Sequence, residues 1–187
     1  MVNDSLQNAT RAIHDVGLAA WLGGSMFGKF ALNPAVAGIS DSKERGRVAN
    51  LAWNGYNVVN SLGLGSAAVG YLAARSTELG DGRITDSERT LYRVQDVLMA
   101  AAVGTGIANG IQGARLAKQA PDGAVPIEDG TTPAPETPPA AAKIQKSLGV
   151  LGNVNIVTGI ALVAVNAVQS RRQVSRPPLR RALLRRS

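Results

Sequence analysis

The chain has 187 residues, of which 45% are hydrophobic and only 4% aromatic, and its formal net charge is +7. Its single histidine and its lack of cysteine exclude disulfides, thiolate metal sites, cysteine nucleophiles and any site that needs two histidines from one chain. The positive charge comes from the C-terminal tail, which has seven arginines and no acidic residue after Val168, so the rest of the chain is neutral.

Four apolar stretches rich in glycine and alanine alternate with polar segments. Three of them approach the ~20 residues that a membrane-spanning helix needs. The pattern predicts helices over residues 10–32, 47–75, 88–118 and 141–172. Asn33-Pro34 is expected to end the first helix, because proline disfavours a helical backbone in the residue before it. Gly80-Asp81-Gly82 separates the second helix from the third, and Pro177-Pro178 prevents the fourth from continuing.

The segment between the third and fourth helices, residues 119–140, contains six prolines, four acidic residues and no lysine or arginine. A segment of this composition cannot bury enough apolar surface to offset the conformational entropy that it would lose on ordering. We therefore expect a disordered, extended linker at this position.

These elements predict an all-α fold, a four-helix transmembrane bundle in residues 1–172 with the disordered acidic, proline-rich loop, followed by an arginine-rich tail at 173–187. Small residues at four-residue spacing would let the helix backbones approach closely. An even number of spans places both termini on one side, and the basic tail favours the cytoplasm. We therefore expect a multi-pass protein of the cell membrane, with a soluble helical bundle as the alternative.

The asparagines of the second predicted helix recur at spacings of four, three and three residues, which places them on one face. Asparagines of the third and fourth helices reach a similar depth. We expect a shared polar patch made by Asn54, Asn57, Asn60, Asn109, Asn153 and Asn155. Two interpretations stay open, namely amide hydrogen bonds that hold the bundle together, or a site for a small ligand or ion.

A second group of polar residues stands near the starts of the first and third helices, on the side expected to be cytoplasmic. His14, Asp15, Arg93 and Asp96 are predicted to form an interfacial cluster. Simple ionic contact is one interpretation, and a histidine–carboxylate pair that relays a proton or orients a quinone or haem is the other. Lys29 is expected to extend to the outer membrane boundary.

The arginine tail is expected to contact anionic lipid head groups, and a topogenic anchor without specific binding is the alternative. Its members are Arg171, Arg172, Arg176, Arg180, Arg181, Arg185 and Arg186. No nucleic-acid partner is expected, because no folded basic domain or base-stacking aromatic accompanies the tail. A protein partner or a homo-oligomer stays open.

The helices rich in alanine, glycine and arginine, and the run Ile13-His14-Asp15-Val16-Gly17 before Trp21-Leu22-Gly23-Gly24, resemble uncharacterised four-span integral membrane proteins of high-GC, actinobacteria-like bacteria. The resemblance implies a cell-membrane location and no particular activity.

The sequence has no phosphate-binding loop, no pair of carboxylates deep in a span and no credible Ser-His-Asp arrangement. We therefore expect no catalytic residue, metal or cofactor. The leading prediction is a non-enzymatic structural or interaction protein. One alternative is a small transporter, channel or lipophile-binding module that uses the asparagine patch. The other is a membrane subunit of a quinone- or haem-linked enzyme.

Overall fold

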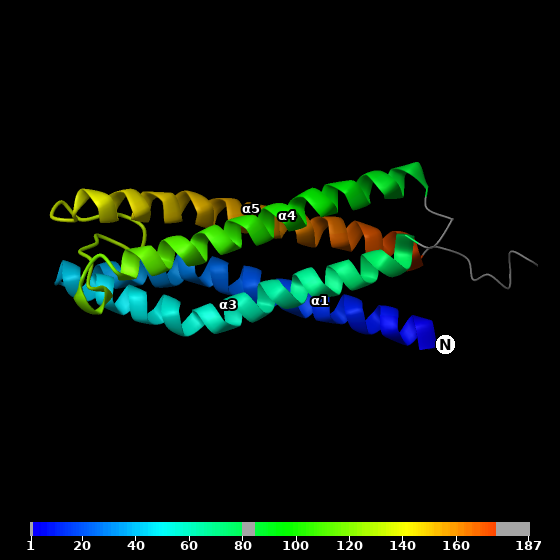
Figure 1. Cartoon of the computed structure of the whole chain (residues 1–187), viewed down its shortest axis with the longest axis horizontal. Helices are drawn as coiled ribbons and strands as arrows, with labels where there is room; N and C mark the ends of the chain where they lie inside the picture. Colours follow the sequence, from blue (N-terminus) through cyan, green and yellow to red (C-terminus); the bar gives the residue numbers. More distant parts are fainter. Residues whose placement is uncertain (1, 80–84, 175–187) are drawn as a thin grey trace, which may run out of the picture.

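A computed structural model describes residues 2–79 and 85–174 of the chain (Figure 1). The described residues form four long helices and no β-strand, which confirms the all-α class. The long helices are α1 (Val2–Phe27), α3 (Ser42–Leu79), α4 (Asp86–Ala117) and α5 (Pro139–Val174). Three short elements, η1 (Gly28–Leu32), α2 (Asn33–Ala35) and η2 (Val36–Gly38), prolong α1, and η3 (Pro121–Gly123) lies between α4 and α5.

The first helical segment does not end at Asn33-Pro34, so this predicted boundary is wrong. The backbone N–H of Asn33 bonds to the carbonyl of Gly28, five residues back, and the chain stays helical through Gly38. A π-helical turn of this kind accommodates the missing N–H and the ring of a proline without breaking the helix. The other long helices lie within a few residues of their predicted bounds, although α3 begins earlier, at Ser42.

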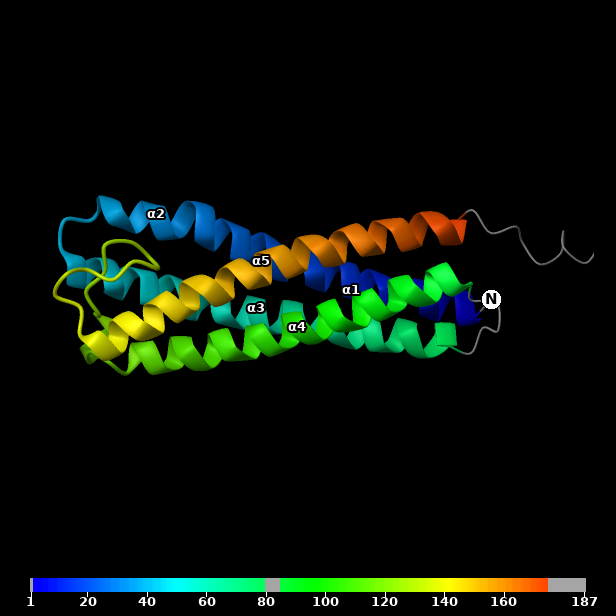
Figure 2. The same ribbon diagram turned by 90° about the horizontal axis from the view of Figure 1, so that it is seen from above.

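The four helices pair as α1 with α3 and α4 with α5, and the two pairs contact each other less extensively. All four run along the same long axis (Figures 1 and 2). The start of α1 and the end of α5 lie at one end of the molecule, and the connections before α3 and before α5 lie at the other. Because the number of long helices is even, the first helix begins at the same end of the molecule at which the last one finishes.

Small residues bring α1 and α3 into close contact, as their spacing predicts. Gly63, Ala67, Gly70 and Ala74 on α3 are all buried. A Cβ added at Gly17 of α1 would lie 2.5 Å from the carbonyl oxygen of Gly63 on α3, so the close approach of the two helices requires glycine at this position. Midway along the molecule, side chains from all four helices form the apolar core, which comprises Leu18, Trp21, Leu22, Ala67, Tyr71, Met99, Ala102 and Leu162.

The connection from α4 to α5 is ordered, so the prediction of a disordered linker over residues 119–140 is wrong. Its backbone packs on the start of α3, where a side chain at Gly46 would meet the carbonyl of Val125 at 1.8 Å. The N–H of Ile127 donates to the carbonyl of Ser42 at 3.1 Å, and Val125 and Ile127 are buried. The segment is held by backbone contacts and a few buried side chains, which average composition does not reveal.

Arg45 joins this loop to the preceding turn. Its Nε donates to the carbonyl of Ile39 at 2.5 Å, and its Nη1 lies 3.4 Å from the carbonyl of Glu128. Ser42 also donates to the carboxylate of Glu136 at 2.5 Å. Arg45 therefore binds carbonyl oxygens of both connections at this end of the molecule, the one before α3 and the one before α5.

The outer surface of the helices is apolar. Large hydrophobic side chains point outward along all four long helices, among them Val16, Phe27, Leu51, Val58, Leu62, Val69, Val97, Ile107, Val150, Val157 and Ile160. Two helices, α4 and the part of α5 up to Arg171, are long and apolar enough to cross a membrane by length and composition.

Candidate functional site: an amide-lined cavity at the loop end

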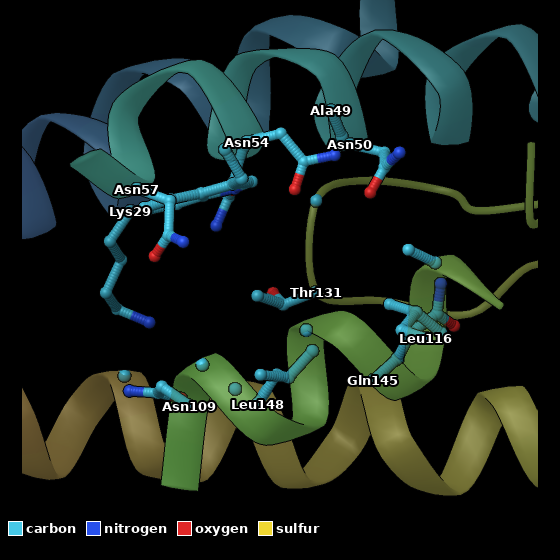
Figure 3. Close-up of a pocket in the computed structure, with 18 of the residues that line it drawn as sticks. Lys29, Ala49, Asn50, Asn54, Asn57, Asn109, Leu116, Thr131, Gln145 and Leu148 are labelled. Carbon is cyan, nitrogen blue, oxygen red and sulfur yellow. The ribbon is translucent and has the colours of Figure 1, made fainter. Parts of the chain in front are cut away.

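A cavity of about 260 Å³ lies at the loop end of the molecule, bounded by α3, α4, α5, the prolonged α1 and the ordered loop (Figure 3). Its polar lining consists mainly of side-chain amides, namely Asn33, Asn50, Asn54, Asn57, Asn60, Asn109, Asn155 and Gln145, together with Ser25 and Thr131. Small residues of α4 and α5, including Gly110, Gly113, Gly149 and Gly152, leave the space open. A cavity of ~150 Å³ accepts benzene, so this one has room for a larger molecule.

Five of the six asparagines predicted to share a polar patch line this cavity, and the exception is Asn153, which is exposed and lies outside it. The residues are brought together because α3 turns one face, repeating every three to four residues, towards α4 and α5. The sequence pattern therefore predicted the grouping from α3, α4 and α5, and its repeat on α3 begins at Asn50, which also lines the cavity, but it gave no indication of Asn33 or Gln145.

The amides of the patch make few bonds to the protein. Asn155 accepts a hydrogen bond from the hydroxyl of Thr105. By contrast, no hydrogen bond joins Asn54, Asn57, Asn60 or Asn109 to any residue in the described ranges 2–79 and 85–174. Their donors and acceptors are thus available to whatever occupies the cavity.

Gln145 presents the clearest unmet hydrogen-bonding capacity. Its side chain is only 1% exposed, and neither its Nε2 nor its Oε1 has a partner among the described residues. A buried amide without partners costs free energy, so a polar group inside the cavity would stabilise it. The flanking Lys143 and Lys146 are exposed and do not line the cavity.

Among the described residues, Lys29 contributes the only charged side chain to the lining, and none of them contributes a carboxylate. In Figure 3 its ammonium group extends into the space between Asn57 and Asn109. Lys29 belongs to the π-helical turn η1, which is widened ahead of Pro34, and π-turns are frequent at functional sites. The prediction that Lys29 extends to the membrane boundary is therefore not supported by its position.

The ordered loop closes the outer end of the cavity through contacts with asparagines. The carbonyl of Asn33 accepts from the N–H of Gly130 at 3.2 Å, and its side-chain oxygen accepts from the indole N–H of Trp53 at 3.1 Å. Gly123 has a φ of +67° and lies against the Asn50 amide, where a side chain would clash at 2.2 Å. Glycine is required here both for its conformation and for its size.

Asp129 shapes the part of the loop that faces the cavity. Its Oδ1 accepts from the backbone N–H of Thr131 at 2.7 Å and of Thr132 at 2.9 Å. Partial burial by itself would raise the pKa of Asp129, but these hydrogen bonds and those from the two threonine hydroxyls outweigh it, so the pKa lies below its usual value.

The second predicted cluster divides into two separate contacts near the opposite end of the molecule. The Nδ1 of His14 faces the carbonyl of Ala67 at 2.6 Å, and its Nε2 faces the Asn166 amide nitrogen at 2.7 Å. The carbonyl can only accept, so Nδ1 carries the proton and Nε2 accepts from Asn166. Asp15 also lies 3.4 Å from that nitrogen, and Gln95 donates to the Asn166 oxygen at 2.6 Å.

The other two members of that cluster are not in contact with His14. Asp96 instead accepts from the hydroxyl of Tyr71 and pairs with Arg75 at 3.3 Å. Arg93 is exposed and does not line the small pocket beside His14. His14 therefore belongs to a hydrogen-bond network that joins α1, α3, α4 and α5.

Of the predicted lipid-contacting arginines, Arg171 is exposed on the last turns of α5. The side chain of Arg172 and all of the arginines from Arg176 onward lie outside the described residues. No group of three or more potential metal-ligating side chains occurs in the part of the chain that the structure describes.

The chain matches no known protein family, and no curated protein or solved structure is significantly similar to it. The resemblance to four-span bacterial membrane proteins therefore stays a prediction, and functional inference rests on the geometry of the chain itself.

Proposed function

We propose that this chain is a membrane-embedded four-helix bundle that binds a small polar ligand in the amide-lined cavity. This proposal takes up the interpretation of the asparagine patch as a site for a small ligand, and it differs both from the lipophile-binding module and from the purely structural protein that the sequence also left open. The observation that carries it is the set of amides that line the cavity without a hydrogen-bond partner among the described residues, above all the buried Gln145. Amides that served only to join helices would bond to one another.

The membrane location is supported by the distribution of polarity. Residues 48–74, 97–114 and 147–170 contain no charged side chain, and their large apolar residues point outward. In the most apolar windows of α4 and α5, only 11% and 28% of residues are buried. The core helix of a soluble protein would be mostly buried, and an exposed apolar surface of this extent marks contact with lipid or protein.

The first helix fits the same arrangement once the position of Lys29 is taken into account. Lys29 interrupts its apolar run, but the ammonium group extends into the polar cavity rather than outward. The neighbouring Phe27 and Phe30 are exposed on the outside. An intramembrane cation that faces a polar interior is the arrangement expected of a functional residue.

We further propose that both termini are cytoplasmic, with the tail arginines at anionic lipid head groups. The cavity and its loop then lie on the outer side. A cysteine at the exposed Pro135, introduced into this cysteine-free chain, would react with a membrane-impermeant maleimide from outside intact cells. Labelling only after lysis would contradict this orientation.

The binding proposal is tested with Asn57→Leu in purified protein reconstituted in phosphatidylcholine nanodiscs. The probes are sorbitol, glucose, gluconate, glycerate and phosphatidylglycerol incorporated in the bilayer. We expect at least one of them to raise the melting temperature of the wild type, and Asn57→Leu to abolish this shift while the protein still inserts. Asn153→Leu is the matched control, because Asn153 lies outside the cavity, and it should respond as the wild type does.

Two outcomes would overturn the binding proposal. One is a wild type that responds to none of the probes although it is folded. The other is loss of folding in Asn57→Leu but not in Asn153→Leu, which would identify the patch as polar contacts that hold the helices together.

A further inference from the structure

The charge and donor pattern of the cavity defines the chemistry of its ligand. Within residues 2–79 and 85–174, the lining contains one cation, Lys29, and no carboxylate. Neither a hydrogen bond nor an ion pair links the Lys29 ammonium group to another residue in the described parts of the chain. A cation in a partly enclosed site without a counter-ion favours a ligand that supplies one negative charge.

The amides define the remainder of the ligand. Each asparagine or glutamine side chain offers two N–H donors and a carbonyl acceptor, and a hydroxyl group can use both kinds. Gln145 lies well apart from Lys29 in the cavity (Figure 3), and both of its polar atoms lack partners among the described residues. A ligand that also satisfied Gln145 would have to extend beyond its charged group and present hydroxyl groups on that side.

We propose that the cavity selects a small monoanion whose charged group contacts Lys29 and whose hydroxylated carbons contact the surrounding amides and Gln145. This inference rests on the proposed binding function and specifies its ligand class. The same chemistry occurs in a free sugar acid and in the glycerol phosphodiester head group of an anionic lipid. Both are small chemical groups, and the cavity that would hold them has a volume of about 260 Å³.

The test compares gluconate with sorbitol, which have the same number of carbons but differ in charge. Binding to full-length protein in phosphatidylcholine nanodiscs is measured by isothermal titration calorimetry. We expect gluconate to bind at least ten-fold more tightly than sorbitol. Lys29→Gln should remove this preference, whereas Lys43→Gln should retain it, because Lys43 is exposed and does not line the cavity.

A second experiment distinguishes the lipid source of the same chemistry. Nanodiscs with phosphatidylglycerol replace those with phosphatidylcholine alone, and the melting temperature is measured without gluconate. If the head group is the occupant, phosphatidylglycerol stabilises the wild type and Lys43→Gln but not Lys29→Gln. Stabilisation that is equal in all three proteins would indicate general attraction to anionic lipid and would contradict occupation of the cavity by the head group.

Gln145→Leu provides an independent readout of the uncharged part of the ligand. It should weaken gluconate and sorbitol by similar factors, because both present hydroxyl groups to this position. Equal affinities for the two polyols in the wild type, unaffected by Lys29→Gln, would overturn the anion inference while the binding function stands. The absence of binding by gluconate, sorbitol and phosphatidylglycerol to folded protein would overturn the inference, and if glucose and glycerate also fail, the binding function fails with it.

Discussion

At the scale of single residues, two groups of polar side chains lie among the helices but differ in how far their hydrogen-bonding groups are paired. The side chain of Asn166 is bonded on both sides, since its nitrogen donates to the ring of His14 and its oxygen accepts from the amide of Gln95. Around the cavity, Gln145 and several asparagines have no partner in the part of the chain that the structure describes. A fully satisfied network stabilises a single arrangement of helices, whereas an unsatisfied group is available to bind another molecule.

The Asn166 network predicts a specific cost of truncation. Asn166→Ala removes the contact to His14 and the one accepted from Gln95, and leaves both partners unpaired. Because interhelical hydrogen bonds in membranes are individually weak, we expect a loss of about 1–2 kcal/mol in the free energy of unfolding. The measurement is steric-trap or detergent unfolding, and Asn153→Ala on the same helix should change it by less than about 0.5 kcal/mol. Equal effects of the two variants would contradict a structural role for the network.

Residue spacing predicted much of the asparagine grouping, because a repeat of three to four residues is a geometric property of one helix. It could not predict the roles of Lys29 and Gln145. Lys29 lies in a π-turn that directly precedes Asn33-Pro34, and Gln145 stands between two exposed lysines in a segment that resembles a solvated helix start. Both depend on how elements distant in the sequence meet.

At the scale of elements, the long helices were predictable because charge-free segments of glycine, alanine and aliphatic residues have few alternatives in an apolar environment. The ordered loop was not predictable from composition. Its position depends on Gly46, whose missing side chain admits the backbone of Val125, and on Arg45, which binds backbone carbonyls. Neither feature changes the average polarity of the segment.

Two glycines on α3 give a matched test of how the loop is held. Gly46→Ala would place a Cβ 1.8 Å from the Val125 carbonyl, whereas a Cβ at Gly55 meets nothing within 4 Å. We expect Gly46→Ala to destabilise the closed loop by about 1–3 kcal/mol and to accelerate Glu-C cleavage after Glu128. Gly55→Ala should leave this rate unchanged and stabilise the helix by roughly 0.5–1 kcal/mol. Unaltered cleavage in Gly46→Ala would show that the loop does not depend on this contact.

The loop also has a predictable dependence on pH. The folded pKa of Asp129 is below its unfolded value, so its contribution to stability is complete above the unfolded value of about 3.9 and is lost as the pH falls through the folded pKa. Hydrogen-exchange protection of the Thr131 and Thr132 amides should therefore persist at neutral pH and decrease in strong acid. Asp129→Asn should exchange faster already at neutral pH and show a smaller further loss. Identical acid profiles in both proteins would exclude the Asp129 carboxylate as the cause.

At the scale of the whole molecule, polarity increases from the outside to the cavity, which is the reverse of a soluble bundle. Apolar side chains such as Val58 and Ile107 face outward, and the amides and Lys29 face inward. In water this arrangement would expose a large apolar surface. In a bilayer the same surface contacts hydrocarbon, and the polar groups line the cavity between the helices.

A single outward-facing residue tests which solvent surrounds the bundle. Val157 lies near the middle of α5, is 66% exposed and lines no described cavity. Val157→Lys places a charge at mid-membrane, which costs about 2.5–3.5 kcal/mol on insertion scales. We therefore expect a marked fall in the fraction of protein that resists alkaline carbonate extraction, whereas Val157→Leu retains it. In a soluble bundle the same lysine would point into water and change neither solubility nor stability, so a carbonate-extractable wild type with an unimpaired Val157→Lys variant would exclude the bilayer as its surroundings.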